Sequence, residues 1–148
     1  MNPNLYRDGK VCISILNTWK GEQWSSCQTI KSILLSLLMI FNDKPLLNEP
    51  GFTETHSDFK KYNDILYYKN IDIGILKVMK YENLYPTTRY FKNIIKENFL
   101  NNYKKILDVI EKKSKVKCTL EIETYNMIAN IDYDKLKEDI IELYNNLK

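Results

Sequence analysis

An asparagine and a cysteine stand eight residues apart near the start of the chain, and together they could carry out acyl transfer. Asn4 belongs to an Asn-Pro-Asn turn, and Cys12 lies in an apolar run. A Cys thiolate is a nucleophile that can accept an acyl group as a thioester, and a side-chain amide can donate to the oxyanion of the tetrahedral intermediate. The turn-forming dipeptide Asp8-Gly9 lies between them and predicts a turn that brings the two side chains together. Taken alone, the pair is weak evidence, because Asn4 is better read as an ordinary turn residue and Cys12 as a small buried hydrophobe.

The residues that follow predict the elements that must hold this pair. Residues 11–16 are β-branched and partly alternating, which predicts a short strand or extended segment carrying Cys12. Thr29 is a good N-cap for an apolar helix over residues 30–41. Because that helix is apolar on almost every side, we expect it to be buried over most of its circumference or to bind a partner.

Helical periodicity dominates the rest of the chain. Gly74 is unfavourable inside the first long helix, Pro86 is placed to begin the second, and Asp132 or Asp134 would cap the last. The predicted elements are a loop over residues 42–55, helices over about 58–82 and 87–113, a strand over 116–124 and a helix ending near 147. They predict an α+β fold in which helices dominate.

Composition argues against several classes of function. The net charge is only +3, from 22 Lys and Arg against 19 Asp and Glu, so no nucleic-acid partner is expected. The longest apolar stretch, residues 33–41, is much shorter than the roughly 20 residues that cross a bilayer. With no signal peptide visible, we expect a cytoplasmic protein without a membrane partner. One His and three widely spaced Cys residues (Cys12, Cys27, Cys118) fit neither a zinc site nor a disulfide framework, so no metal and free thiols are expected.

Three motifs, in this order, carry a resemblance to a known family. Residues 2–4 read Asn-Pro-Asn and precede Cys12, residues 24–30 read Trp-Ser-Ser-Cys-Gln-Thr-Ile, and residues 48–51 read Asn-Glu-Pro-Gly. The stretch closely resembles the active-site region of ubiquitin-conjugating (UBC) enzymes, and within them the large atypical branch with Asn-Pro-Asn in place of His-Pro-Asn. The resemblance is strong over residues 2–52 and traceable to about residue 113.

The resemblance implies a role for each site residue. Cys12 would accept the C-terminal carboxyl of ubiquitin as a thioester from a ubiquitin-activating enzyme; that enzyme consumes the ATP, so no cofactor is expected here. Asn4 would stabilise the oxyanion when a lysine attacks, or support the active-site loop. Asn48 and Glu49 fall near the family's acidic gate. A carboxylate there would orient the incoming ammonium and help remove its proton, because a lysine with a pKa near ~10.4 is a poor nucleophile at neutral pH.

The resemblance also implies partners and a division of the chain. Leu35 and Met39 would contact the donor ubiquitin, and the expected partners are ubiquitin, its activating enzyme and a ubiquitin ligase. Residues 1–113 would form the C-terminal part of a UBC-like catalytic core, and residues 114–148 an extension with a strand and a final helix. In the family a first helix and most of an antiparallel meander precede the Asn-Pro-Asn motif, so we expect the N-terminal half of the core to be missing from this chain.

Three functions stay open at this point. The first is an active ubiquitin-conjugating enzyme, a transferase that forms a thioester on Cys12 and passes ubiquitin to a lysine. The second is a catalytically silent UBC-like module that keeps ubiquitin or ligase contacts, as the missing front half suggests. The third is a helical protein–protein adaptor, as the length of residues 58–148 suggests.

Overall fold

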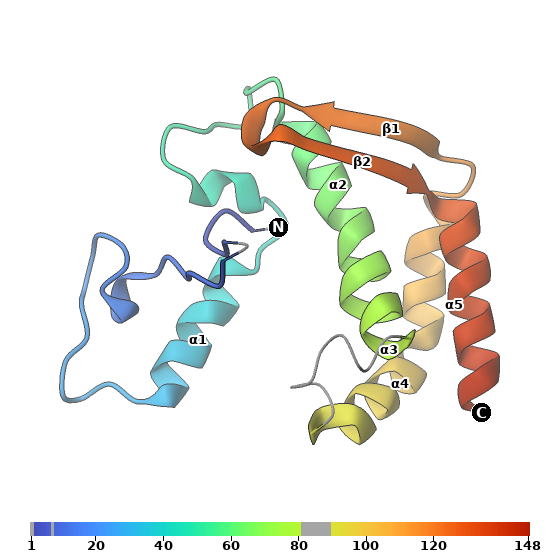
Figure 1. The fold of residues 1–148 in the computed structure, drawn as a ribbon, viewed down its shortest axis with the longest axis horizontal. Coiled ribbons are helices and arrows are strands. Elements are labelled where there is room, and N and C mark those ends of the chain that lie inside the picture. Colours follow the sequence, from blue (N-terminus) through green and yellow to red (C-terminus); the bar gives the residue numbers. More distant parts are fainter. Residues whose placement is uncertain (1, 7, 81–89) are drawn as a thin grey trace. The chain divides into compact units, whose positions relative to one another are not determined.

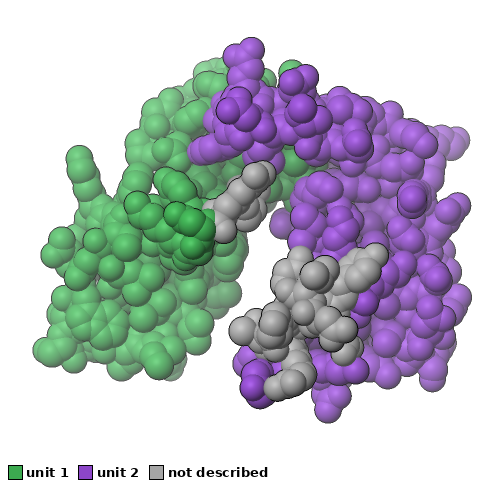
Figure 2. All heavy atoms as spheres, viewed as in Figure 1, with its two compact units in different colours: residues 1–66 green, residues 67–148 purple. Residues whose placement is uncertain are grey.

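The computed structural model describes residues 2–6, 8–80 and 90–148 (Figure 1). These residues adopt an α+β fold in which helices dominate and a two-stranded antiparallel sheet is formed, which confirms the predicted class. Residues 1–66 and 67–148 form two compact units, coloured separately in Figure 2. No helix within the described ranges is both long and apolar enough to cross a bilayer.

The first unit opens with a short antiparallel turn. Leu5 and Val11 form a single β-bridge, and the amide of Tyr6 donates to the carbonyl of Lys10 over 2.9 Å. Gly9 lies within this turn at φ 91°, a left-handed conformation that suits glycine. Pairing ends soon after, because Ser14–Leu16 form one turn of 3-10 helix. The predicted strand over residues 11–16 is therefore wrong beyond residue 13, since the chain turns there instead of meeting a second strand.

Helix α1 spans Ile30–Ile40 and starts where the sequence indicated. The side chain of Thr29 accepts from the amide of Ser32, whose hydroxyl in turn accepts from the Thr29 amide, so both ends of a capping box are present. The expected burial is wrong, because no α1 residue is buried in the structure. An apolar side chain gains free energy when it is buried, but only if another part of the protein covers it. The sequence of the helix shows which side chains are apolar and does not show what covers them.

The rest of the first unit packs around a small set of apolar side chains. A 3-10 helix, Pro45–Asn48, places Leu46 with no exposed surface, and α2 (Phe59–Ile71) begins soon after it. The buried apolar residues of the unit are Cys12, Ile13, Ile15, Leu46, Tyr62, Ile65 and Leu66.

Helix α2 passes into a π-helical turn, Asp72–Lys77, and then into α3, Val78–Lys80. The amide of Val78 donates to the carbonyl of Ile73, five residues back. Asp72, buried at 8 % exposure, pairs with Lys69 at 2.8 Å and Lys77 at 3.3 Å. The sequence predicts one continuous helix here and misses the π turn, which contains Gly74. The predicted helix end at residue 82, and the helix start at Pro86, lie outside the described residues.

In the second unit, α4 (Lys92–Glu111) packs against α5 (Tyr133–Leu147). The rings of Tyr103 and Tyr144 stack with centroids 3.7 Å apart. The core of the unit combines residues 68–76 with the two helices and with Ile131, and its deepest side chains are Ile110, Leu136 and Ile140. Both α4 and α5 confirm predicted helices, and the predicted start near residue 87 lies outside the described residues.

A β-hairpin connects α4 and α5. Strand β1 (Lys117–Ile122) confirms the alternating pattern, and it pairs antiparallel with β2 (Met127–Asp132), which the sequence analysis missed. At the end of β2 the side chain of Asp132 accepts from the amide of Lys135 over 3.0 Å, which confirms the predicted cap of α5. This hydrogen bond, and next the ion pair with Lys117, lower the pKa of the Asp132 carboxyl.

Candidate active site

Asn4 and Cys12 lie directly opposite each other in the antiparallel turn. The amide of Cys12 donates to the carbonyl of Asn4, and the side-chain Nδ2 of Asn4 donates to the carbonyl of Cys12, both over 2.8 Å. The backbone amide of Asn4 donates to Oδ1 of Asn2 over 2.9 Å and is not available to the Cys12 carbonyl. The side chain of Asn4 supplies the donor to that carbonyl instead. The structure brings the predicted pair together.

Only the nitrogen end of the Asn4 side-chain amide has a hydrogen-bond partner within the described residues. Its Oδ1 atom is buried and accepts no hydrogen bond within the described residues. A buried acceptor without a donor costs on the order of 1–3 kcal/mol. The observed orientation is therefore set by the Nδ2 donation to Cys12 and not by both halves of the amide.

The backbone on both sides of Cys12 is fixed by one hydroxyl. Thr18 Oγ1 donates to the carbonyl of Val11 and accepts from the amide of Ile13 over 3.1 Å. Cys12 itself is only 3 % exposed, whereas Cys27 and Cys118 are exposed. Sequence reasoning missed Thr18, because nothing in its type or spacing distinguishes it from an ordinary loop threonine.

A second anchor holds the Asn-Pro-Asn turn to the end of α1. The carbonyl oxygen of Ile40 accepts from Asn2 Nδ2 at 2.6 Å and from Asn48 Nδ2 at 3.0 Å. Asn48 Oδ1 also accepts from Asn42 Nδ2 over 3.0 Å. The carbonyls of the last helical turn have no intrahelical partner, so these side chains supply it. Asn48, predicted at the gate, has its amide engaged in positioning.

The remainder of the predicted gate lies in a chain of turns. The amide of Glu49 donates to the carbonyl of Leu46, and the carbonyl of Glu49 accepts from the amide of Phe52. His56 follows, with its ring centroid 4.6 Å from that of Phe52 and its Nδ1 accepting from the amide of Asp58 over 3.1 Å. Glu49 is half-buried, and its role in receiving a proton stays a prediction.

The predicted ubiquitin-contact residues are open to solvent. Leu35 is 52 % exposed and Met39 is 82 % exposed, and three further apolar side chains of α1 (Ile30, Leu34, Leu38) are at least half exposed. Their spacing of three and four residues puts these side chains on one broad face of α1. The face is available to a partner, and the identity of that partner stays a prediction.

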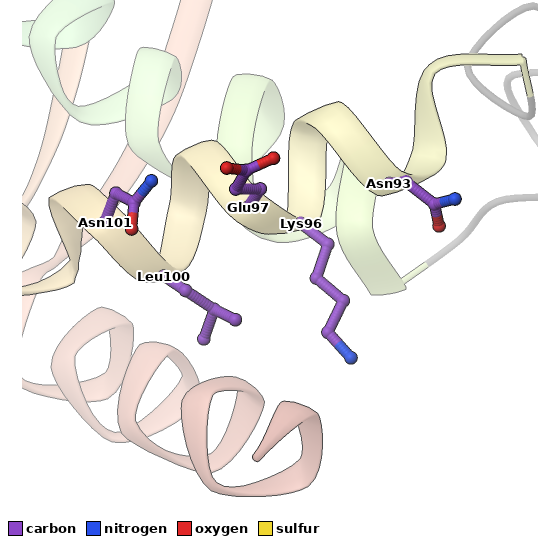
Figure 3. Close-up of a pocket in the computed structure, with 5 residues that line it drawn as sticks. All are labelled: Asn93, Lys96, Glu97, Leu100 and Asn101. Carbon is purple, nitrogen blue, oxygen red and sulfur yellow. The ribbon is translucent and has the colours of Figure 1, made fainter.

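Elsewhere the described residues offer little that could perform chemistry. A shallow pocket of about 250 Å³ lies along α4, lined by Asn93, Lys96, Glu97, Leu100 and Asn101 (Figure 3). All of these residues come from one helix, and no Cys, Ser, Thr or His is among them. In residues 2–6, 8–80 and 90–148, no three His, Cys, Asp or Glu side chains are placed to hold a metal ion. The Asn4–Cys12 turn is therefore the strongest candidate site.

Comparison with known proteins places this turn in a family. The family model described as ubiquitin-conjugating enzyme matches residues 1–73. Ubiquitin-conjugating enzyme E2 Z of Homo sapiens is 39 % identical over 104 residues, which are 69 % of this chain and 29 % of that protein. Probable ubiquitin-conjugating enzyme E2 23 of Arabidopsis thaliana is 36 % identical over 105 residues, 67 % of this chain and 9 % of that protein. The chain spans less than a third of the length of these relatives. The predicted boundary at residue 113 stays a prediction.

We expect Asn48→Asp to destabilise the first unit by about 1–3 kcal/mol, because the Ile40 carbonyl loses a donor and faces a carboxylate. Urea unfolding at pH 7 followed by tryptophan fluorescence is the measurement. It reports on this unit, since Trp19 and Trp24, the two tryptophans of the chain, both belong to it. The exposed Asn93→Asp, in the second unit, is the matched control. An Asn48→Asp variant with an unchanged midpoint would contradict the anchoring role.

Proposed function

The chain belongs to the ubiquitin-conjugating enzyme family over residues 1–73, and on this premise we propose that it accepts ubiquitin as a thioester on Cys12 and transfers it to a lysine. The observation that carries the proposal is the reciprocal pairing of Asn4 and Cys12, in which a side-chain amide lies beside the backbone of a thiol-bearing residue. Both parts of thioester chemistry, a nucleophile and an amide donor, thus belong to one small turn.

The first step is acceptance of ubiquitin. The Cys12 thiolate attacks the thioester carbonyl on the activating enzyme, a new C–S bond forms, and the enzyme's own sulfur leaves with the electron pair of the old one. Because Cys12 is 3 % exposed, the groups that cover it must move before so large an acyl donor can reach the sulfur. Charging therefore includes an opening of the turn around Cys12.

The second step is aminolysis. A neutral lysine amine attacks the ubiquitin carbonyl on Cys12, and negative charge develops on that carbonyl oxygen. As the intermediate collapses, the C–N bond is kept, the C–S bond breaks, Cys12 leaves as the thiolate and the proton of the amine passes to a base. Asn4 Nδ2 is the donor that can meet this charge, once it leaves the Cys12 carbonyl. The unpaired Oδ1 favours this rotation of the Asn4 side chain, because no donor in the described residues holds the oxygen in place.

The other predicted roles complete the proposal. Glu49 orients the ammonium of the incoming lysine and helps remove its proton, while Asn48 positions the loop through the Ile40 carbonyl. Leu35 and Met39 contact the donor ubiquitin through their exposed apolar surface. The partners are ubiquitin, its activating enzyme and a ubiquitin ligase, the setting is the cytoplasm, and the ATP is used by the activating enzyme.

We expect the chain to form a thiol-sensitive adduct when mixed with activating enzyme, ubiquitin and ATP. Cys12→Ala should lose the adduct, and Cys12→Ser should form a thiol-resistant ester in its place. Cys27→Ala is the matched control, because Cys27 is an exposed thiol of the same unit and should leave the yield unchanged. Non-reducing and reducing gels measure both results. A folded chain that forms no adduct, or one whose adduct is lost in Cys27→Ala, would refute the proposal.

We expect Asn4→Ala to charge within about twofold of the unaltered chain and to discharge onto free lysine roughly 10²–10³ times more slowly, the loss measured where an oxyanion donor is removed. A pulse-chase assay measures the two rates separately. Asn93→Ala, on α4, is the control. If charging falls as much as discharge, Asn4 acts only by supporting the turn through its bond to the Cys12 carbonyl.

A second candidate function is a catalytically silent ubiquitin-binding module, favoured by the exposed apolar face of α1 together with the burial of Cys12. Both candidates predict binding of uncharged ubiquitin, which an NMR titration of labelled ubiquitin measures. Met39→Asp should weaken binding at least tenfold, about 1.4 kcal/mol, and Ile128→Asp, an exposed apolar residue of β2, should not. Shifts without charging favour the silent module, and no shifts at all contradict the α1 contact.

A further inference from the structure

The β-hairpin of the second unit contains an exposed strand, β1. Within the described ranges β1 pairs with β2 alone, and β2 continues directly into α5 (Figure 1). Four of the six residues of β1 are exposed, against two of the six in β2. Only every second residue of an antiparallel strand exchanges backbone hydrogen bonds with its partner, so half of the N–H and C=O groups of β1 point towards its other edge. Such an edge is a template for a further strand.

The side chains of β1 divide into an inner and an outer set. Leu120 packs on the core of the unit and Ile122 is buried, so alternation puts Cys118 on that inner face as well. The outer face carries the other three residues, all of them exposed: Lys117, Thr119 and Glu121. The outer face therefore has a positive charge at one end of the strand, a negative charge towards the other and a threonine midway.

This order of charges is complementary to itself when the strand is reversed. In an antiparallel pair of β1 strands centred on Thr119, Lys117 of each copy lies opposite Glu121 of the other. Opposite charges that face each other across two strands stabilise the pair, and so do two threonines. Registers centred on Lys117 or on Glu121 would instead place like charges opposite each other. Lys117 already contacts Asp132 at 2.9 Å in its own hairpin, and its ammonium has three donors, enough for both carboxylates.

The inner face supports the same register. Cys118 of each copy would lie opposite Leu120 of the other, and because Cys118 is exposed and Leu120 only partly buried, the pairing covers apolar surface. The edge of β2 offers no such match. A pair of β2 strands centred on Asn130 would place the apolar Ile128 opposite the charged Asp132.

We propose that β1 is a self-association surface, which joins two copies of this chain into a four-stranded sheet by antiparallel β1–β1 pairing about Thr119. The contact is isologous, because both copies use the same residues. Strands of this length bury little area, so the dimer is weak and its population depends on concentration. The surface belongs to the second unit, so the inference does not depend on thioester chemistry at Cys12.

Analytical ultracentrifugation of the full chain under reducing conditions, from micromolar to millimolar concentration, measures the association. We expect a monomer–dimer equilibrium. Glu121→Lys should weaken it roughly tenfold or more, because two attractive pairs with Lys117 become repulsive. Glu138→Lys, the same change of charge at an exposed position of α5, is the matched control and should leave the dissociation constant within about twofold.

Cysteine cross-linking tests the register. In a Cys27→Ser, Cys118→Ser background, Thr119→Cys should form a disulfide-linked dimer on oxidation, because the two new thiols lie directly opposite each other. Asn130→Cys in the same background is the matched control, since Thr119 donates to Asn130 over 2.8 Å and both variants lose that hydrogen bond. Its two copies would lie about 14 Å apart, three strand spacings of about 4.8 Å, which is too far for a disulfide.

The two experiments give outcomes that decide the inference. A dimer weakened by Glu121→Lys, with cross-linking confined to Thr119→Cys, supports it. A chain that stays monomeric at millimolar concentration overturns it. A dimer that Met39→Asp weakens and Glu121→Lys does not is formed through α1, which also overturns it. Equal cross-linking of the two cysteine variants means random collision and overturns the register.

Discussion

One carbonyl oxygen, that of Ile40 at the end of α1, is the point on which the candidate site depends. It accepts from Asn2 Nδ2, the other end of the Asn2 amide accepts from the Asn4 backbone, and the Asn4 side chain donates to the Cys12 carbonyl. A continuous series of hydrogen bonds thus runs from a helix end to the candidate nucleophile. Asn2 and Asn48 each use both ends of the side-chain amide, whereas Asn4 uses only its Nδ2 end. An ionised carboxylate only accepts hydrogen bonds, so it could not supply these donors.

Elements with strong local signals could be predicted from the sequence. Thr29 and Asp132 cap helices as expected, because a cap depends on only a few neighbouring residues. β2 was missed because its last residue, Asp132, is also the cap of α5, so the signal for the start of a helix overlaps the end of the strand. The exposure of α1 could not be predicted, since apolar residues in a sequence do not say what lies opposite them.

The candidate site was predictable in part for the same reason. Asn4 and Cys12 are joined by a short turn, so turn chemistry alone indicates that they meet. The bonds from Asn2 and Asn48 to Ile40 cross 38 and 8 residues, and the first of these depends on how the chain folds back. Thr18 was missed because a threonine that bonds to the backbone looks like any loop threonine until its partners are known.

The π-helical turn Asp72–Lys77 has a consequence for the length of the chain. Residues five apart point about 140° away from each other on an α-helix, yet Lys77 reaches Asp72 here, because a π turn contains one residue more than an α turn. Loss of one residue within this turn would convert it to α-helix, and the side chains of α2 and α3 would keep their directions relative to each other. Loss of one residue within α2 would instead rotate everything after it by about 100°. A Cβ added at Gly74 would meet no atom within 4 Å, so the turn could lose this residue without losing a side-chain contact.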